Sequence, residues 1–364
     1  MTLSHSISMA IYYVFCIGAS GCLLPFLGKT LERSGFSAGQ MSLLLALLPI
    51  SQFIFPPVWA AYADRFNRRT ILMRLSPICA ALFAAAMAFQ PGSQQMSQFT
   101  FAVLLISGFC IFFSPVIPLA DAHTNAAIGK DLEQFGRIRV WGSISFAACA
   151  GGLGLIHISN RPSLQWGMVA GAYGLTALVG KLFLTEVSPA TSQANLSPSL
   201  GSQPLPSAKN ISFANQVKQF FSRLDIILII SASTLYFFGH GAFEIFFSVH
   251  LGHLGFDDRF IGLAWFLGLC IEIILMRIVP LRIGRWSMRR TLAICALVNC
   301  LRWLVIAFTK RGAIILCVQV LHSLTFGVWY LALNMLVHRK TGPSFKAMTQ
   351  ISVAGSIAGG RLIS

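Results

Sequence analysis

Charged side chains are scarce in this chain of 364 residues. Asp, Glu, Lys and Arg together make up 10% of it, and only 11 residues are acidic, whereas soluble domains typically carry about 25% charged residues. A chain of this composition cannot cover a water-facing surface. Hydrophobic residues make up 55% of the sequence, and the mean hydropathy is +0.72. We therefore expect the folded chain to be solvated by membrane lipid.

The sequence also lacks the motifs of soluble chemistry. Its nine cysteines lie in apolar segments without CxxC or Cys/His ligand spacing, which is typical of packing residues. Gly151, Gly152 and Gly154 lie inside an apolar run, outside the strand–helix context of a nucleotide-binding loop. Because no nucleophile, phosphate loop or metal-ligand pattern is evident, we predict neither an enzyme nor an ATP-driven pump, and no cofactor or metal.

Ten apolar runs are long enough to cross a bilayer, which takes about 20 helical residues. They cover residues 6–28, 39–62, 71–90, 98–121, 138–159, 165–185, 225–250, 258–280, 290–309 and 312–337. An eleventh run begins near Ala347 and is cut off at Ser364. The sequence thus predicts an all-α transmembrane fold with about ten complete helices and part of an eleventh.

The formal net charge of +16 indicates membrane topology rather than nucleic-acid binding, because the basic residues lie in short loops between apolar runs. Two of the 27 lie well inside runs, Arg302 and Arg361. Six lie in or beside the loops after odd-numbered runs, namely Lys29, Arg33, Arg161, Arg259, Lys310 and Arg311. The others lie in the loops after even-numbered runs, so the positive-inside rule predicts a cytoplasmic N-terminus. Residues 186–223, rich in Ser, Pro, Gln and Asn, read as a flexible cytoplasmic linker.

An internal repeat supports a division into two halves. Residues 31–37 (LERSGFS) recur as residues 251–257 (LGHLGFD), and residues 68–70 (RRT) recur as residues 289–291. Each pair occupies the same place in the predicted topology. We therefore expect an N-terminal six-helix half over residues 1–185 and an incomplete C-terminal half over residues 224–364, the parallel-repeat plan of facilitator transporters.

The loop after the second run carries a family motif. Residues 60–69 (AAYADRFNRR) resemble the major facilitator signature GxxxDRxGRR, with Ala60 and Asn67 in place of its two glycines. The resemblance implies that this loop forms a cytoplasmic gate, in which the carboxylate caps a helix of the other half. Its gating residues would be Asp64, Arg65, Arg68 and Arg69. The alternative is a charged loop that only sets topology.

A closer resemblance is to the lactose-permease-like branch of that superfamily, particularly its phenylpropionate-permease-like members. Residues 135–143 (FGRIRVWGS) are similar to the FGRxRxxG stretch of that branch. The resemblance implies that Asp121 and Arg139 bind substrate, and that Phe146 replaces a sugar-stacking tryptophan. Arg137 and Arg139 point to nearly opposite helix faces, so at most one lines a cavity. Either arginine could instead anchor its helix at the cytoplasmic interface.

In the second half, Glu272, Arg302 and His322 match the Glu, Arg and His of the permease's proton-coupling cluster. Thr325 stands where that permease has its proton-carrying glutamate, so coupling needs another carboxylate. Glu272 and a second candidate, Glu244, are available for that role. From the residues alone, Glu272 and Arg302 could equally form a structural ion pair between two helices.

These observations predict a proton-coupled transporter of a small organic solute, with an aromatic carboxylate as first choice from the resemblance. It would work as a monomer in the lipid of a bacterial inner membrane, with the proton gradient as its energy source and no nucleic-acid partner. The alternative is a truncated, non-transporting relic or a membrane-bound interaction protein. The cut-off eleventh run and the lack of a twelfth favour that alternative.

Overall fold

The computed structural model of the chain describes residues 3–66, 68–89, 96–128, 132–184, 222–283, 285–341, 353, 355–357 and 359–361. The helices in this part of the chain are α1 (Leu3–Leu23), α2 (Leu27–Arg33), α3 (Ala38–Phe66), α4 (Arg69–Ala88), α5 (Met96–Phe113), α6 (Val116–Ile128), α7 (Leu132–Leu155), α8 (Pro162–Phe183), α11 (Leu224–His253), α12 (Asp258–Ile283), α13 (Met288–Phe308), α14 (Gly312–Gln319) and α15 (Trp329–Thr341). Two short segments join them, the 3-10 helix η1 (Ile158–Asn160) and the π-helix η2 (Leu324–Val328).

The described helices account for the predicted membrane spans. Nine helical stretches in this part of the chain are long and apolar enough to cross a membrane. The remaining predicted span, the sixth run at residues 165–185, corresponds to α8, whose four glycines and Lys181 lower its hydropathy. Its 22 residues extend about 33 Å, enough to cross the hydrocarbon core of a bilayer. The all-α transmembrane prediction is confirmed.

Three predicted spans are interrupted. The first ends at Leu23, because Pro25 has no N–H for the helical ladder and the chain turns into α2. The fourth divides at Ser114 and Pro115 into α5 and α6. The tenth run divides at Val320 and Leu321, after which the chain forms η2 and α15. A π-helical segment inside a membrane helix is frequently found at a functional site.

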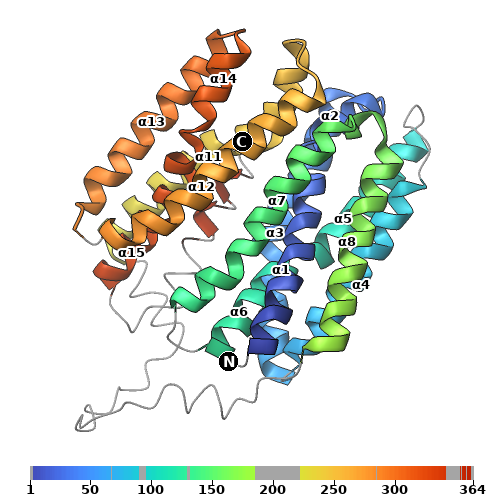
Figure 1. Cartoon of the computed structure of the whole chain (residues 1–364), viewed down its shortest axis with the longest axis horizontal. Coiled ribbons are helices and arrows are strands. Elements are labelled where there is room, and N and C mark those ends of the chain that lie inside the picture. Colours follow the sequence, from blue (N-terminus) through green and yellow to red (C-terminus); the bar gives the residue numbers. More distant parts are fainter. Residues whose placement is uncertain are drawn as a thin grey trace.

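Figure 1 shows the helices in two groups, α1 to α8 and α11 to α15, with α7 and α12 side by side along the boundary. The predicted linker up to residue 221, and Ala347 at the start of the predicted eleventh span, lie outside the described residues. The division into halves at residues 185 and 224 therefore stays a prediction.

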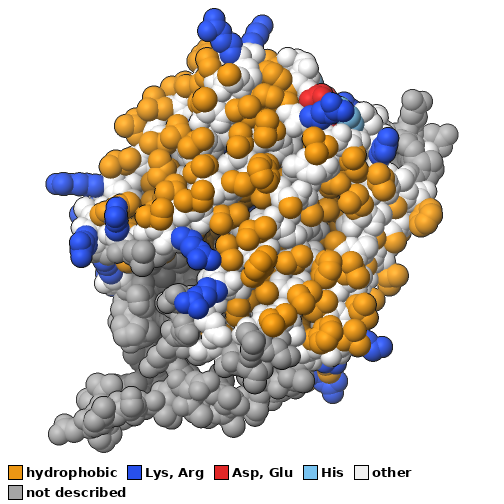
Figure 2. Space-filling view, in the orientation of Figure 1, with side chains coloured by type: hydrophobic (Ala, Val, Ile, Leu, Met, Phe, Trp, Pro, Cys, Tyr) orange, Lys and Arg blue, Asp and Glu red, His pale blue; other side chains and the backbone are white. Residues whose placement is uncertain are grey.

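Apolar side chains cover much of the surface that Figure 2 presents, while most Lys and Arg side chains lie toward its margins. Large apolar residues in the middle of helices are among the most exposed, for example Leu235 at 70%, Leu82 at 65% and Leu104 at 63%. In water such exposure would be costly, but against lipid tails it is not. The surface is that of a membrane protein.

The internal repeat has a structural counterpart in two turns. Gly35 and Gly255 both adopt a positive φ, 86° and 88°, which glycine reaches without strain. In each turn the N–H after the glycine bonds back over five residues, from Phe36 to Leu31 O (3.3 Å) and from Phe256 to Leu251 O (3.0 Å). This is the Schellman cap of a helix end. The two copies of the repeat, residues 31–37 and 251–257, therefore encode the same turn.

Glycines bring α7 and α12 into backbone contact. A Cβ atom at Gly262 would lie 2.6 Å from the Ala150 carbonyl oxygen and 3.0 Å from Cα of Gly154. A Cβ at Gly154 would lie 2.5 Å from the Asp258 carbonyl oxygen. No side chain larger than hydrogen fits at either position, so these two glycines fix how closely the two groups of helices approach each other.

Candidate functional site

A cavity of about 250 Å³ lies between the two groups of helices. Its first wall includes Ile17 of α1, Leu27 of α2, Pro49 of α3 and Arg139, Ser143 and Phe146 of α7. Its second wall includes Trp265, Leu269 and Glu272 of α12, with His322 and Phe326 around η2. A largely apolar cavity with a few convergent polar groups is the usual form of a small-molecule site.

Arg139 lines this cavity, whereas Arg137, two residues earlier on α7, is exposed. The Arg139 side chain lies 3.4 Å from Asp121 Oδ1, measured from Nε. Tyr13 supports both groups: its hydroxyl donates to the same carboxylate oxygen at 2.7 Å, and its ring centroid lies 5.3 Å from the guanidinium. The two predicted substrate residues are therefore together, and one of them faces the cavity.

Aromatic rings of both groups face the cavity. Phe146 and Trp265 lie with their ring centroids 6.2 Å apart and their planes tilted by 38°. Phe326, in η2, lines the cavity as well. Phe146 was predicted to bind substrate, but sequence reasoning missed Trp265 and Phe326.

Arg302 is completely buried inside the second group of helices. Its guanidinium donates to Gln319 Oε1 at 3.0 Å and to the Thr325 hydroxyl at 3.3 Å. That hydroxyl in turn donates to the His322 carbonyl oxygen at 3.0 Å. The Thr325 hydroxyl therefore donates its proton within the chain and joins η2 to the preceding turn. The π-helical segment and the buried cation are parts of one polar cluster.

Glu272 lies against His322, with Oε2 and Nε2 3.7 Å apart. Both residues line the cavity, and both are largely buried, with side chains 19% and 8% exposed. The His322 ring also stacks on His240, with centroids 5.6 Å apart. The predicted coupling residues Glu272 and His322 are thus brought together at the cavity wall. A direct Glu272–Arg302 pair stays a prediction.

The remaining predicted residues lie away from the cavity or outside the description. Arg65 and Arg68 are exposed, and Arg69 donates to the Ala122 carbonyl oxygen of α6 at 3.4 Å. The side chains of Asp64 and Glu244 lie outside the described residues. The roles of these residues in gating and in proton coupling stay predictions.

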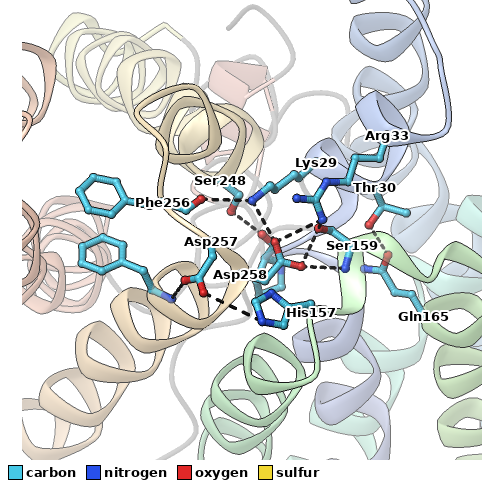
Figure 3. Close-up of polar contacts among 12 residues, drawn as sticks. Lys29, Thr30, Arg33, His157, Ser159, Gln165, Ser248, Phe256, Asp257 and Asp258 are labelled. Atoms are coloured by element: carbon cyan, nitrogen blue, oxygen red, sulfur yellow. Dashed lines mark hydrogen bonds and ion pairs between the residues drawn. The ribbon is translucent and has the colours of Figure 1, made fainter.

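A second polar site closes the end of the molecule where α2 lies, and we call it the α2-end network (Figure 3). At its centre Lys29 of α2 pairs with Asp258 of α12, Nζ to Oδ1, at 2.9 Å. Their side chains are only 5% and 0% exposed. Lys29 also donates to the Phe256 carbonyl oxygen at 3.3 Å. The ion pair therefore joins the two groups of helices away from solvent.

Asp258 is held from a second element of the first group. Its Oδ2 accepts from the backbone N–H of Ser159 in η1 at 2.9 Å and from the hydroxyl of the same residue at 2.6 Å. Arg33 reaches the same place, with Nη1 3.7 Å from Asp258 Oδ1 and a hydrogen bond to the Ser159 hydroxyl. A buried carboxylate with this many donors is well compensated for its lost hydration.

Two further contacts join the groups at the rim of this network. His253 at the end of α11 lies 2.7 Å from Glu32 of α2, in a pair whose side chains are 68% and 36% exposed. His157 lies 4.0 Å from Asp257. Exposed pairs of this kind contribute little to stability, about 0–1 kcal/mol. The buried Lys29–Asp258 pair is therefore the dominant polar contact at this end.

The cavity and the α2-end network are connected through Trp265. Its indole N–H donates to the Ser248 hydroxyl of α11 at 3.4 Å. Ser248 donates in turn to the carbonyl oxygen of Pro25, between α1 and α2. A ring that lines the cavity is therefore hydrogen-bonded, through one hydroxyl, to the opposite group of helices beside Lys29.

Sequence reasoning missed this network because it counted Lys29 and Arg33 as loop charges. A signal was present in the repeat: Asp258 follows the second turn where Ala38 follows the first, and Gly252 stands where the first turn has Glu32. Glycine at position 252 leaves room for the Lys29 side chain, since a Cβ atom there would lie 3.2 Å from Lys29 Cε.

Comparison with known sequences places this architecture in a family. The model of the MFS_1 like family matches residues 6–361. The chain is similar to a probable 3-phenylpropionic acid transporter of Escherichia coli K12, with 24% identity over 98% of this chain and 90% of the relative. It is also similar to a maltose permease of Geobacillus stearothermophilus, with 25% identity over 82% of this chain and 70% of the relative.

Solved structures show the same fold. The nucleoside transporter NupG superposes with a TM-score of 0.78 and 14% identity, over 99% of this chain and 88% of that one. A bacterial homologue of the lysosomal transporter Spinster, in an inward-facing conformation, superposes with a TM-score of 0.70 and 12% identity, over the whole of this chain and 81% of that one. The relatives are transporters rather than enzymes, as predicted. The chain belongs to the MFS_1-like family, and it is a multi-pass membrane transport protein of the major facilitator type.

Proposed function

We propose that this protein is a proton-coupled secondary transporter of a small aromatic carboxylate. The observation that carries the proposal is the composition of the cavity. Aromatic rings from both groups of helices, Phe146, Trp265 and Phe326, line it together with the guanidinium of Arg139. Rings offer faces for an aromatic body, and a guanidinium binds a carboxylate in a planar, two-pronged geometry.

The size of the cavity and the relatives support the same substrate class. A cavity of about 250 Å³ lies just below the range of about 300–1,000 Å³ that is usual for drug-sized ligands, which favours a single-ring solute. The Arg139 side chain is ion-paired with Asp121 and lies over the Tyr13 ring, so its guanidinium is preorganised. A relative named as a probable 3-phenylpropionic acid transporter supports an aromatic acid. Relatives that carry maltose or nucleosides make those solutes the competing choices.

Proton coupling is assigned to Glu272 and His322. Both line the cavity, and their side chains lie 3.7 Å apart. Thr325 cannot take the proton-carrying role of a glutamate, because a threonine hydroxyl does not ionise at physiological pH. Its hydroxyl instead accepts from Arg302 and donates to the His322 carbonyl oxygen. A carboxylate at the cavity wall can bind a proton from one side of the membrane and release it to the other as the cavity changes access. Glu244 is the second candidate for this role.

The proposed orientation follows the positive-inside rule. The N-terminus and the linker face the cytoplasm of a bacterial inner membrane, and the α2 end faces outward. Asp64, Arg65, Arg68 and Arg69 then belong to the cytoplasmic gate between two halves. A tag accessibility assay tests this arrangement: a reporter at the N-terminus should be protected from external reagent in intact cells and labelled after permeabilisation.

Uptake into proteoliposomes tests the transport function. The purified chain should accumulate radiolabelled 3-phenylpropionate when the lumen is made alkaline, and a protonophore should abolish the accumulation. Uridine and maltose serve as competing substrates in the same preparation. Failure to transport any of the three under an imposed proton gradient contradicts the proposed function, while uptake of uridine or maltose alone contradicts the substrate class.

A further inference from the structure

We propose that Lys29 and Asp258 form an ionic latch between the two groups of helices, which holds the α2 end closed and must open before the cavity can be reached from that end. The latch joins α2 to α12, two elements from opposite sides of the cavity. Transporters of this kind expose a central site alternately at the two ends by movement of one half against the other. The contact that closes one end therefore has to be reversible.

The repeat shows that the latch is not needed to build the local structure. Residues 31–37 form the same Schellman turn as residues 251–257, yet the next residue is Ala38 in the first copy and Asp258 in the second. The following helix is capped in both copies by the preceding residue, through Ser37 to Gln40 N–H and through Asp257 to Phe260 N–H. Asp258 has no part in either cap. Its carboxylate is instead directed at the other group of helices.

Burial makes the pair selective between the closed and the open state. Water weakens an ion pair at the surface to about 0–1 kcal/mol, but Lys29 and Asp258 are only 5% and 0% exposed. Without Asp258, Lys29 would be left buried with no counter-charge in the closed state. Without Lys29, Asp258 would keep its bonds from Ser159 and the longer contact with Arg33, but it would lose its 2.9 Å ion pair. In the open state water would solvate either group. Loss of either charge therefore favours the open state at this end.

The latch is also linked to the cavity. Leu27 and Gly28, next to Lys29 in α2, form part of the cavity wall. On the other side, Trp265 lies about two helical turns after Asp258 on α12 and reaches Pro25 through Ser248. A solute against Trp265 therefore contacts the same helix, and the same hydrogen-bonded chain, that the latch holds in place. This link rests on the proposed function; the latch itself does not.

Distances between spin labels across the two ends test the latch without any substrate. Because the chain has nine cysteines, genetically encoded labels are placed at exposed Arg161 and Arg311 at the α2 end, and at exposed Phe183 and Arg285 at the other end. Pulsed electron–electron double resonance in nanodiscs then gives the distribution of label-to-label distances, and from it the fractions of closed and open forms. Lys29→Met and Asp258→Asn should each raise the open fraction at the α2 end by roughly tenfold or more, and shorten the distance at the other end.

Two further variants complete the test. Glu32→Gln, which removes the exposed pair with His253, is the matched control and should leave the distance distribution unchanged. The doubly neutral Lys29→Met with Asp258→Asn leaves no buried charge behind, so its open fraction should lie below that of either single variant. If one single variant does not fold, the other carries the test, because each of them alone breaks the pair.

The outcomes separate a latch from a merely structural contact. An α2-end distance distribution identical to that of the wild type in a folded single variant overturns the proposal even if the melting temperature falls. A shift as large in Glu32→Gln overturns it as well. Because no substrate is present, a failed uptake assay leaves this result standing, and a failed latch leaves the transport function standing.

Discussion

The Phe146 and Trp265 rings meet across the boundary between the two groups of helices, with centroids 6.2 Å apart, and each belongs to one of the two helices in backbone contact there. A planar solute near these rings would touch both groups at once. The contact between α7 and α12 therefore sets how far apart the two aromatic rings lie.

Substitution of Trp265 should weaken binding of the aromatic acid. Trp265→Ala removes one aromatic face, and since aromatic pairs contribute about 0.5–1.5 kcal/mol beyond their buried area, we expect KM for the aromatic acid to rise roughly tenfold. Trp265→Phe keeps a ring but loses the hydrogen bond to Ser248, so its KM should change less. Initial uptake rates over a range of substrate concentrations give both values. Equal KM in the alanine variant and the wild type would exclude Trp265 from the binding site.

The two arginines of α7 offer a matched pair of substitutions. Arg139→Gln removes one of the two guanidinium groups that line the cavity, the other being that of Arg361, whereas Arg137→Gln removes an exposed one. Hydrogen bonds to charged groups contribute about 1.5–3 kcal/mol, so the first variant should bind a carboxylate at least roughly tenfold more weakly. The second should bind it as the wild type does. Titration calorimetry in detergent measures both, and equal losses would show that the arginines act on the helix rather than on the substrate.

Neutralisation of Glu272 should uncouple transport. Glu272→Gln keeps the size of the side chain but can no longer carry a proton, so accumulation driven by a proton gradient should disappear while exchange of labelled for unlabelled solute continues. Counterflow and gradient-driven uptake in the same vesicles separate the two activities. Asp225→Asn is the control, because the Asp225 carboxylate is paired with Lys340 away from the cavity. Retained gradient-driven uptake in Glu272→Gln would move the coupling role to another carboxylate.

The glycine contact between α7 and α12 should be intolerant of any side chain. Gly262→Ala places a methyl group 2.6 Å from the Ala150 carbonyl oxygen, and overpacking of this kind costs about 1–3 kcal/mol. We expect a lower melting temperature in thermal unfolding. Gly171→Ala is the control, because the described structure has no heavy atom within 4 Å of a Cβ at that position and alanine favours helix. A melting temperature for Gly262→Ala equal to that of Gly171→Ala would contradict the close contact.

Most of the fold could be predicted from the sequence, because hydropathy and helix length are local properties that a membrane imposes directly. The helical spacing of Arg137 and Arg139 was also enough to predict that only one of them faces a cavity. Helix interruptions at residues 24–26 and 320–321 were not predicted. These interruptions depend on the backbone hydrogen bonds on either side of them, which hydropathy does not predict.

The polar interior was harder to predict, since pairing depends on which helix faces are neighbours. The sequence left open whether Glu272 pairs with Arg302, and it did not predict that Glu272 lies beside His322 or that Arg302 donates to Gln319 and Thr325. Lys29 was read as a loop residue, yet its burial depends on Asp258, which lies 229 residues further along the sequence and in the other group of helices. No local pattern contains that information.

The contact of Gly154 with Gly262 has a consequence for how the closed end comes apart. Where side chains interdigitate, two helices must withdraw one set of rotamers from another before they separate, and that withdrawal adds to the barrier. At Gly154 and Gly262 the surfaces that meet are bare backbone, so this contact adds no such withdrawal to the barrier for parting α7 from α12. The side chains that must separate lie elsewhere along the same boundary, as Phe146 does against Trp265.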